Sequence, residues 1–174
     1  SADQIDEVVS SIQSQEGKAL ALQIDVSDLD SITATVDTII SQFGQIDILV
    51  NNAGGGAPEN FPNEDDEGWQ RVLAVNLSGT FYCSRAIWPH LVSAEGGSII
   101  NVSSVAAQRG FSKKMFELSP RAPSASYYAA KAGVDAFTRY IAGVGGQYNI
   151  RVNTLCPGGL ASHLVGNSAK QNSV

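Results

Sequence analysis

The chain has 174 residues, 43% of them hydrophobic and 16% charged, and eleven basic against seventeen acidic residues give a formal net charge of −6. This composition predicts a single globular domain over 1–174 and excludes a disordered chain, while the acidity disfavours nucleic acid and anionic membrane surfaces as partners. No apolar run approaches the roughly 20 residues of a membrane span. The two cysteines, Cys83 and Cys156, form no disulfide framework and no metal-ligand pattern. We therefore expect a cytoplasmic protein without a metal.

The predicted elements alternate between helices and strands. Apolar residues at helical spacing predict helices, and short apolar runs bounded by polar residues or glycine predict strands. In chain order these are a helix over 4–16, a strand over 19–26, a helix that Ser27 caps and Gly44 ends, a strand over 46–50, a helix over 67–90, a strand over 98–104, a helix over 126–143 and a strand over 150–155. Regular alternation predicts an α/β fold in which a parallel sheet has helices on both faces.

The remaining segments carry fewer signals. Residues 105–125 are predicted to be irregular, and the polar tail after Gly166 is predicted to fray. The acidic run over 64–67 precedes a predicted helix, where negative charge favours the positive end of the helix dipole. We therefore interpret this run as helix-stabilising and not as a metal site.

Unusual residues stand at the carboxyl ends of four of the predicted strands. In parallel sheets, ligands bind beyond the carboxyl ends of the strands. The small, hydrogen-bonding groups at these ends therefore favour a crevice lined from several strands, although strand-to-helix turns are commonly rich in such residues whatever their function. The residues are Asp25, Asn51 to Gly54, Ser103 with Ser104, and Pro157-Gly158.

The sharpest chemical signal is the pair Tyr127 and Lys131, which lie four residues apart and so share one face of a predicted helix. A lysine ammonium beside a tyrosine hydroxyl favours the phenolate, which lowers the hydroxyl's pKa from about 10 and suits it to proton exchange with a substrate oxygen. The spacing alone is also that of many exposed helix pairs, so its context in the chain decides between the two interpretations.

Five motifs occur in a fixed order along the chain and supply that context. Together they resemble the short-chain dehydrogenase/reductase family, in its single-domain subfamily, over about Ile5 to Ser162. They are Asn51-Asn52-Ala53-Gly54, Asn76 within LAVNLSGTF, Asn101-Val102-Ser103-Ser104, Tyr127-x-x-x-Lys131 and Pro157-Gly158. The resemblance implies a Rossmann-like, doubly wound parallel sheet and NAD or NADP as the cofactor.

The resemblance also implies a catalytic tetrad. Tyr127 would be the general acid and base, and Lys131 would tune it and hydrogen-bond the nicotinamide ribose. Ser104 would polarise the substrate oxygen, although the roles of Ser103 and Ser104 could be exchanged. Asn76 would hold a water in a proton relay behind Lys131.

Further residues would bind the cofactor if the resemblance holds. Asp25 and Val26 would lie at the adenine, and Asn52, Ala53 and Gly54 at the adenosine ribose. Asn51 could equally brace the sheet. At the nicotinamide the contacts would come from Pro157, Gly158 and Ser162, the last replacing a threonine that is common in the family.

Two departures from the family pattern shape the expectations. No T-G-x-x-x-G-x-G phosphate motif occurs in the 174 residues, nor do the family's first two strands and last strand. We therefore expect an incomplete sheet and an internal piece of a longer enzyme, with a truncated relative that neither binds cofactor nor turns over as the alternative. Tyr127 also follows Ser104 by 23 residues, more than is usual, so residues 105–126 form a long loop that could set specificity or act as a lid, or could be a neutral insertion.

The function expected from these residues is NAD(P)-dependent interconversion of a secondary alcohol and a ketone, and dehydration or epimerisation would use the same Tyr127 and Lys131. Basic residues in the long loop leave room for a carboxylate or phosphate on the substrate, or are simply solvated. The helices over 67–90 and 126–143 resemble the pair that joins subunits in this family. We expect a homodimer or homotetramer of the full-length protein, unless these helices only cover the sheet.

Overall fold

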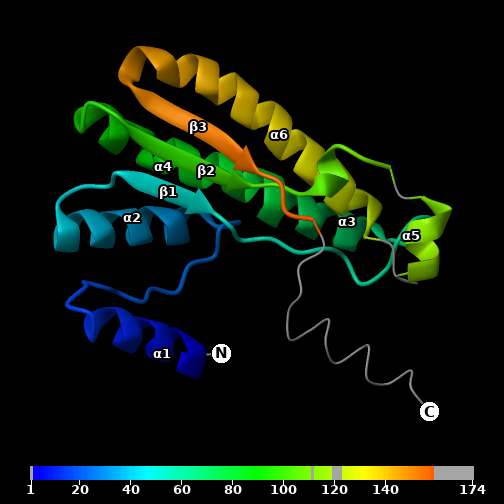
Figure 1. Ribbon diagram of the computed structural model, residues 1–174, viewed down its shortest axis with the longest axis horizontal. Helices are drawn as coiled ribbons and strands as arrows, with labels where there is room; N and C mark the ends of the chain where they lie inside the picture. Colours follow the sequence, from blue (N-terminus) through cyan, green and yellow to red (C-terminus); the bar gives the residue numbers. More distant parts are fainter. Residues whose placement is uncertain (1, 111, 119–122, 159–174) are drawn as a thin grey trace.

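A computed structural model describes residues 2–110, 112–118 and 123–158 (Figure 1). Helices alternate with strands over most of this range, as the sequence predicts. In chain order the elements are α1 (Ala2–Gln13), α2 (Leu29–Phe43), β1 (Ile48–Asn51), α3 (Asp66–Leu73), the π-helical segment η1 (Ala74–Ser78), α4 (Gly79–Ser93), β2 (Gly97–Val102), the 3-10 turn η2 (Val105–Ala107), α5 (Lys113–Leu118), α6 (Ala125–Gly145), the 3-10 turn η3 (Gly146–Tyr148) and β3 (Ile150–Leu155).

The three strands form one parallel sheet in the order β1-β2-β3, which confirms the predicted α/β class. Asn101 in β2 lies opposite Asn51 in β1 and Thr154 in β3. All three arrowheads therefore point to the same edge of the sheet, close to the start of α6 (Figure 1). That edge is where parallel sheets bind ligands.

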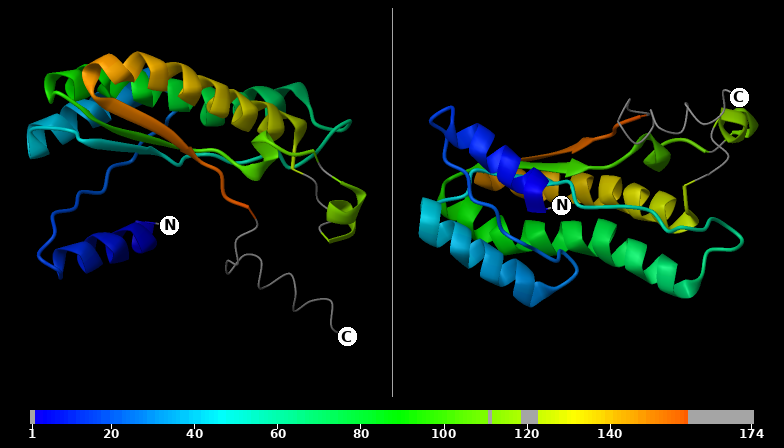
Figure 2. Two further views of the ribbon diagram at one scale, coloured as in Figure 1. Left: turned by 45° about the horizontal axis from the view of Figure 1, so that its top comes forward. Right: turned by 90° about the horizontal axis from the view of Figure 1, so that it is seen from below.

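Helices α2, α4 and α6 cover one face of this sheet (Figure 2). The crossovers from β1 to β2 and from β2 to β3 step in the same direction, so right-handed connections bring α4 and α6 to the same side. The core lies between that face and the three helices, and it contains Ile32, Val36, Ile46, Cys83, Ile87, Leu91, Ile99, Ile141, Ile150 and Val152.

The other face of the sheet is open among the described residues. Its side chains include Ile48, Val50 and Leu155, which are 63%, 53% and 56% exposed. Helix α1 stands apart from the sheet, on the side of β1, and its Ile5 and Val8 are also exposed (Figures 1 and 2). The helices expected on the second face are thus not packed there in the described part of the chain.

The strand expected over 19–26 is not formed. Its apolar alternation is that of a strand, but a strand requires a neighbour with which to exchange backbone hydrogen bonds, and no described strand lies beside it. Leu20, Leu22 and Ile24 are consequently exposed. The segment instead connects α1 to α2 as an extended chain (Figure 1).

The start of α2 lies one residue later than predicted. Asp28 is the N-cap and accepts the backbone N–H of Asp30, because Ser27 is engaged elsewhere. Both the N–H and the hydroxyl of Ser27 donate to Asp25. Gly44 ends the helix as expected, in a left-handed conformation at φ 83° that glycine adopts without steric cost.

The segment over 105–125 has more structure than expected. It contains the 3-10 turn η2 and the short helix α5, whose sequence KKMFEL consists mainly of good helix-forming residues.

Among the described helices, none combines the length and apolarity needed to cross a membrane.

Candidate functional site

The candidate site lies at the carboxyl ends of the strands, where the loop after β1, the segment η1 and the first turns of α6 meet. Asn76 is 1% exposed and occupies the middle of η1. Its side-chain nitrogen donates to the carbonyls of Gly55 at 2.8 Å and Val72 at 2.9 Å, and its side-chain oxygen accepts the N–H of Gly55 at 3.2 Å. This polar side chain, which stands within the mostly apolar run LAVNLSGTF, therefore holds the loop after β1.

Lys131 is buried beside this loop, with 4% of its surface exposed. Its Nζ donates to the carbonyl of Val102 at 2.7 Å and lies 5.6 Å from the centre of the Tyr127 ring. Burial lowers the pKa of the Lys131 ammonium from its ordinary value, because water that would stabilise the charge is excluded.

Asn76 and Lys131 both lie close to Gly54. A Cβ atom at Gly54 would lie 2.5 Å from Oδ1 of Asn76 and 3.2 Å from Nζ of Lys131. Only a residue without a side chain fits between the amide and the ammonium at this distance. Asn52 and Ala53, which precede it, are exposed.

Tyr127 lies in the first turn of α6 and is half-buried. Ser124 caps this helix and accepts the N–H of Tyr127 at 3.3 Å. The predicted spacing holds, because Tyr127 and Lys131 lie one turn apart on the same helix, with the lysine ammonium near the tyrosine ring.

The two serines after β2 differ in their surroundings. Ser103 is buried, and its hydroxyl donates to the carbonyl of Lys131 at 3.1 Å, which attaches α6 to the sheet. Ser104 is half-buried, and its hydroxyl oxygen accepts the N–H of Ala106 at 3.2 Å. Because a hydroxyl is both donor and acceptor, Ser104 can accept this hydrogen bond and still donate its own proton.

The residues predicted at the adenine lie at the end of the extended segment. Asp25 is exposed and accepts the N–H and hydroxyl of Ser27 at 2.8 and 2.6 Å, and these hydrogen bonds lower the pKa of the Asp25 carboxyl. Val26 packs on α4, where a Cβ at Gly79 would lie 2.8 Å from its side chain.

Pro157 and Gly158 follow β3 and lie beside the start of η2. The carbonyl of Pro157 accepts the N–H of Val105 at 3.1 Å, and a Cβ at Gly158 would lie 3.8 Å from the Val105 side chain. Ser162, the last predicted contact, lies outside the described residues.

Asn51 belongs to a buried polar network beneath the helices. Its side-chain nitrogen donates to Oδ1 of Asn101 at 2.8 Å and to the hydroxyl of Ser84 at 3.1 Å, while Asn101 donates to the hydroxyl of Thr138 at 2.8 Å. These bonds link β1, β2, α4 and α6. Asn51 thus braces the sheet, the alternative that its position at a strand end left open.

The acidic run over 64–67 divides between two helices. Asp65 caps α3 by accepting the N–H of Gly68 at 2.6 Å, and Asp66 and Glu67 occupy the first turn, as the dipole argument predicts. Glu64 instead reaches α6, where it accepts the N–H of Ser126 at 3.2 Å and also the Ser126 hydroxyl.

Sequence reasoning did not identify this contact. Ser124 carries a local signal, since a serine before an apolar helical run is a common N-cap. The pairing of Glu64 with Ser126 spans 62 residues and has no signal in the sequence pattern.

Among the described residues, no group of three or more His, Cys, Asp or Glu side chains could hold a metal ion.

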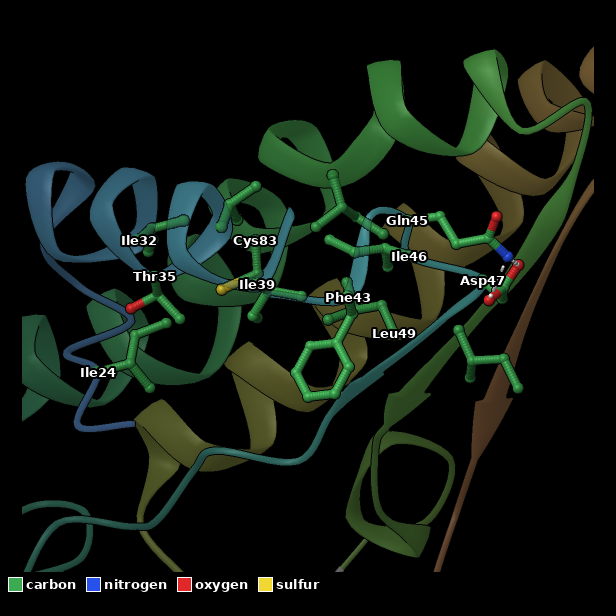
Figure 3. A pocket seen from close by; sticks show the side chains of 13 residues that line it. Ile24, Ile32, Thr35, Ile39, Phe43, Gln45, Ile46, Asp47, Leu49 and Cys83 are labelled. Atoms are coloured by element: carbon green, nitrogen blue, oxygen red, sulfur yellow. Dashed lines mark hydrogen bonds between the residues drawn. The ribbon is translucent and has the colours of Figure 1, made fainter. Parts of the chain in front are cut away.

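A separate apolar groove of about 400 Å³ lies between α2, β1 and α4, next to Ile24 (Figure 3). Ile39, Phe43 and Leu49 line it, and Gln45 donates to Asp47 at its end (Figure 3). None of the predicted site residues lines this groove. The candidate site and the groove are therefore different places in the fold.

Comparison with known proteins gives consistent matches over nearly the whole chain. The profile of a family described as short chain dehydrogenase matches residues 1–173. A 3-oxoacyl-[acyl-carrier-protein] reductase of Synechocystis sp. is 34% identical over 162 residues, which cover 93% of this chain and 62% of that protein. Glucose 1-dehydrogenase 2 of Bacillus subtilis is 34% identical over 170 residues, which cover 97% and 62%.

Two further proteins of this family are similar to the chain. A trans-4-hydroxycyclohexanecarboxylate dehydrogenase of Sinomonas cyclohexanicum is 40% identical over 140 residues, which cover 80% of this chain and 50% of that protein. A crystal structure of a short-chain dehydrogenase/reductase from Burkholderia xenovorans has a TM-score of 0.83 and 28% identity, covering 97% of this chain and 61% of that one. The chain thus spans between half and about three fifths of the length of these relatives.

Proposed function

Because this chain belongs to the short-chain dehydrogenase family, we propose that it acts as an NAD(P)-dependent oxidoreductase that interconverts a secondary alcohol and a ketone. The observation that supports this most directly is the buried Lys131 ammonium, which lies near both the Tyr127 ring and Gly54. A buried charge is costly unless it is paired or hydrogen-bonded, and ionisable groups perturbed by burial concentrate at functional sites. This ammonium donates to Val102 and stands beside a tyrosine, a group able to exchange protons. The proposed domain comprises residues 1–174.

The residues present fit the nicotinamide end of such a cofactor. Val102 accepts one of the three N–H donors of Lys131, and the neighbouring Gly54 presents backbone without a side chain. The remaining N–H donors of Lys131 suit the hydroxyls of the nicotinamide ribose. We assign Lys131 to the nicotinamide ribose, Pro157 and Gly158 to the nicotinamide, Asn52 to Gly54 to the adenosine ribose, and Asp25 and Val26 to the adenine. When bound, the nicotinamide supplies or accepts the hydride.

The chain's own residues would then manage the proton. In reduction, the Tyr127 hydroxyl donates its proton to the carbonyl oxygen, and in oxidation the same atom takes the proton of the alcohol. Lys131 stabilises the phenolate, and Ser104 donates its hydroxyl proton to the substrate oxygen. Asn76 holds the loop after β1 in place, and it would support a water behind Lys131.

The test is Tyr127→Phe in the complete gene product, with Tyr128→Phe as the matched control on the next position of the same helix. We expect Tyr127→Phe to lower kcat by roughly a hundredfold or more, the usual contribution of a positioned acid or base, while the cofactor Kd stays within about twofold. Tyr128→Phe should keep both values.

The assay follows the absorbance of NADH and NADPH with substrates suggested by the names of the three relatives reported above: a 3-oxoacyl thioester, glucose, and trans-4-hydroxycyclohexanecarboxylate. A Tyr127→Phe variant with near-parental kcat would refute the proton-transfer role. A parent protein that binds neither nucleotide would favour the non-catalytic alternative.

We further propose that the protein forms a homodimer, or a homotetramer containing it, through the outer face of α4 and α6. This face has a groove of about 370 Å³ lined by Phe81, Ser84, Arg85, Trp88, Pro89, Phe137, Tyr140, Ile141 and Val144. Tyr140 is 72% exposed, and the Arg85 guanidinium stacks 5.1 Å from the Phe81 ring. Exposed aromatic and arginine side chains are enriched at interfaces.

The oligomer is tested by light scattering of the Tyr140→Glu variant. Burying an unpaired carboxylate in an apolar interface is strongly unfavourable, so we expect the variant to be monomeric where the parent is not. An unchanged mass would place the interface elsewhere.

We also propose a cytoplasmic location, which is supported by the free thiols of Cys83 and Cys156 in the described chain.

A further inference from the structure

The first turn of α6 is tied to the loop after β1 by side chains that the proposed chemistry does not use. Ser124 and Ser126, on either side of the helix start, are 1% and 0% exposed. Ser126 donates its backbone N–H to Oε2 of Glu64 at 3.2 Å and its hydroxyl to Oε1 of the same carboxylate. The Ser124 hydroxyl lies 3.0 Å from the Ser126 hydroxyl and accepts the N–H of Ala57 at 3.2 Å.

Glu64 therefore caps α6, a helix that is distant from it in the sequence. The first N–H groups of an α-helix have no partner within the helix, and a carboxylate near them is also favoured by the helix dipole. In α6, Ser124 accepts the N–H of Tyr127, and Glu64 accepts that of Ser126. The carboxylate thus immobilises the residue immediately before the proposed proton donor.

The same loop contacts the other half of the site. Its beginning, at Gly54 and Gly55, is held by Asn76 and packs against Lys131, while its end at Glu64 holds the start of α6. Residues 54–64 therefore span the distance between the lysine ammonium and the turn that carries Tyr127. Glu64 contacts Ser126, the residue before Tyr127, whereas the hydrogen bond of the Lys131 ammonium goes to Val102.

From this arrangement we propose that Glu64 is a positioning residue for Tyr127, which acts by fixing the first turn of α6 against the loop after β1. The inference rests on the proposed function, because it assigns Glu64 a part in the same proton transfer. Its consequence is a split between kinetic constants. Proton transfer falls steeply when the donor is misplaced, and a displacement of about 1 Å can cost a hundredfold in rate. Cofactor binding is preserved, because the contacts of Lys131 with Val102 and of Asn76 with Gly55 do not involve Glu64.

The experiment compares Glu64→Ala, Glu64→Gln and Glu59→Ala in the complete gene product. Glu59 is exposed in the same loop and has no hydrogen-bond or ion-pair partner among the described residues, so its variant controls for the loss of one negative charge. The measurements are kcat on the best substrate of the panel above, the Kd for NADH and NADPH from nicotinamide fluorescence, and the melting temperature.

We expect Glu64→Ala to lower kcat by about ten- to a hundredfold while the cofactor Kd changes by less than about twofold. Glu64→Gln keeps the side-chain length and an amide oxygen that can accept the Ser126 N–H, so it should recover most of the rate. Glu59→Ala should match the parent. This rescue by glutamine separates positioning from general loss of charge.

If Glu64→Ala does not fold, Ser126→Ala decides, because it removes the hydroxyl donor and leaves the backbone N–H in place. We expect a fall in kcat of about three- to tenfold with the cofactor Kd retained. If Glu64→Ala folds and its kcat is within twofold of the parent, the role of Glu64 is overturned while the proposed function stands. The same holds for Ser126→Ala if Glu64→Ala does not fold. A parent without any NADH- or NADPH-linked turnover overturns the proposed function, and this inference with it.

Discussion

Replacing Gly54 by alanine tests how closely the loop after β1 packs against Asn76 and Lys131. The added Cβ would lie 2.5 Å from Oδ1 of Asn76, whereas real Cβ atoms essentially never come closer than 3.0 Å, so the amide must move by at least about 0.5 Å, the difference between the two distances. Gly55→Ala is the matched control, because a Cβ at Gly55 meets no atom within 4 Å. Neither glycine has a positive φ, so alanine fits the backbone at both positions.

The cost at Gly54 has two parts. Forcing an extra methyl group into a packed site costs about 1–3 kcal/mol. Moving Oδ1 of Asn76 also stretches its 3.2 Å hydrogen bond from the Gly55 N–H, which contributes about 1 kcal/mol when lost. We therefore expect Gly54→Ala to lower the free energy of unfolding by about 2–4 kcal/mol, and Gly55→Ala to leave it unchanged or raise it by up to about 1 kcal/mol through the unfolded chain.

Urea unfolding of the complete gene product, followed by tryptophan fluorescence, measures both variants. Cofactor affinity provides a second readout, because the Cβ would also lie 3.2 Å from Nζ of Lys131, the proposed ribose ligand. We expect Gly54→Ala to weaken binding and Gly55→Ala to retain it. Equal unfolding free energies for the two variants, within about 0.5 kcal/mol, would refute the packing argument.

Two further predictions concern buried ionisable groups. Burial lowers the pKa of Lys131, so between that lowered value and 10.5 the unfolded chain binds more protons than the folded chain. Across this pH window we expect the free energy of unfolding of the wild type to rise with pH relative to that of Lys131→Met. Parallel pH profiles of the two unfolding free energies would contradict this. Burial also raises the pKa of the Cys83 thiol, whereas Cys156 is half-buried. At neutral pH we expect an aromatic disulfide reagent to label Cys156 first and Cys83 only on unfolding, so equal labelling rates in the native protein would show the site of Cys83 to be open.

The order and type of most elements could be predicted from the sequence, because the signals are local. The helix over 126–143 occurs as Ala125–Gly145, and the strand over 150–155 has the predicted bounds. The helix over 67–90 occurs as α3, η1 and α4, and the polar Asn76 inside it marks the π-helical segment. Apolar periodicity, caps and glycine stops lie within a few residues of the element they specify.

Tertiary contacts decided which of the predicted elements form and which face of the sheet the helices cover. The segment over 19–26 has a strand pattern but no described partner strand, and a strand pattern without a neighbour leaves its backbone groups unpaired. Similarly, the sequence predicts helices on both faces, but the direction of the crossovers between β1, β2 and β3 determines that α4 and α6 cover the same one.

For the candidate site, the sequence by itself determined the residue types and their spacing: a tyrosine and a lysine one helical turn apart, a serine pair after a strand and an asparagine in an apolar helix. Only the tertiary structure decided what these residues contact. It brings both Asn76 and Lys131 close to Gly54 and sets Glu64 against Ser126, residues that lie far apart in the chain. Helical spacing follows from backbone geometry within one turn, whereas a contact across 62 residues depends on how the loop after β1 and α6 pack in the folded chain.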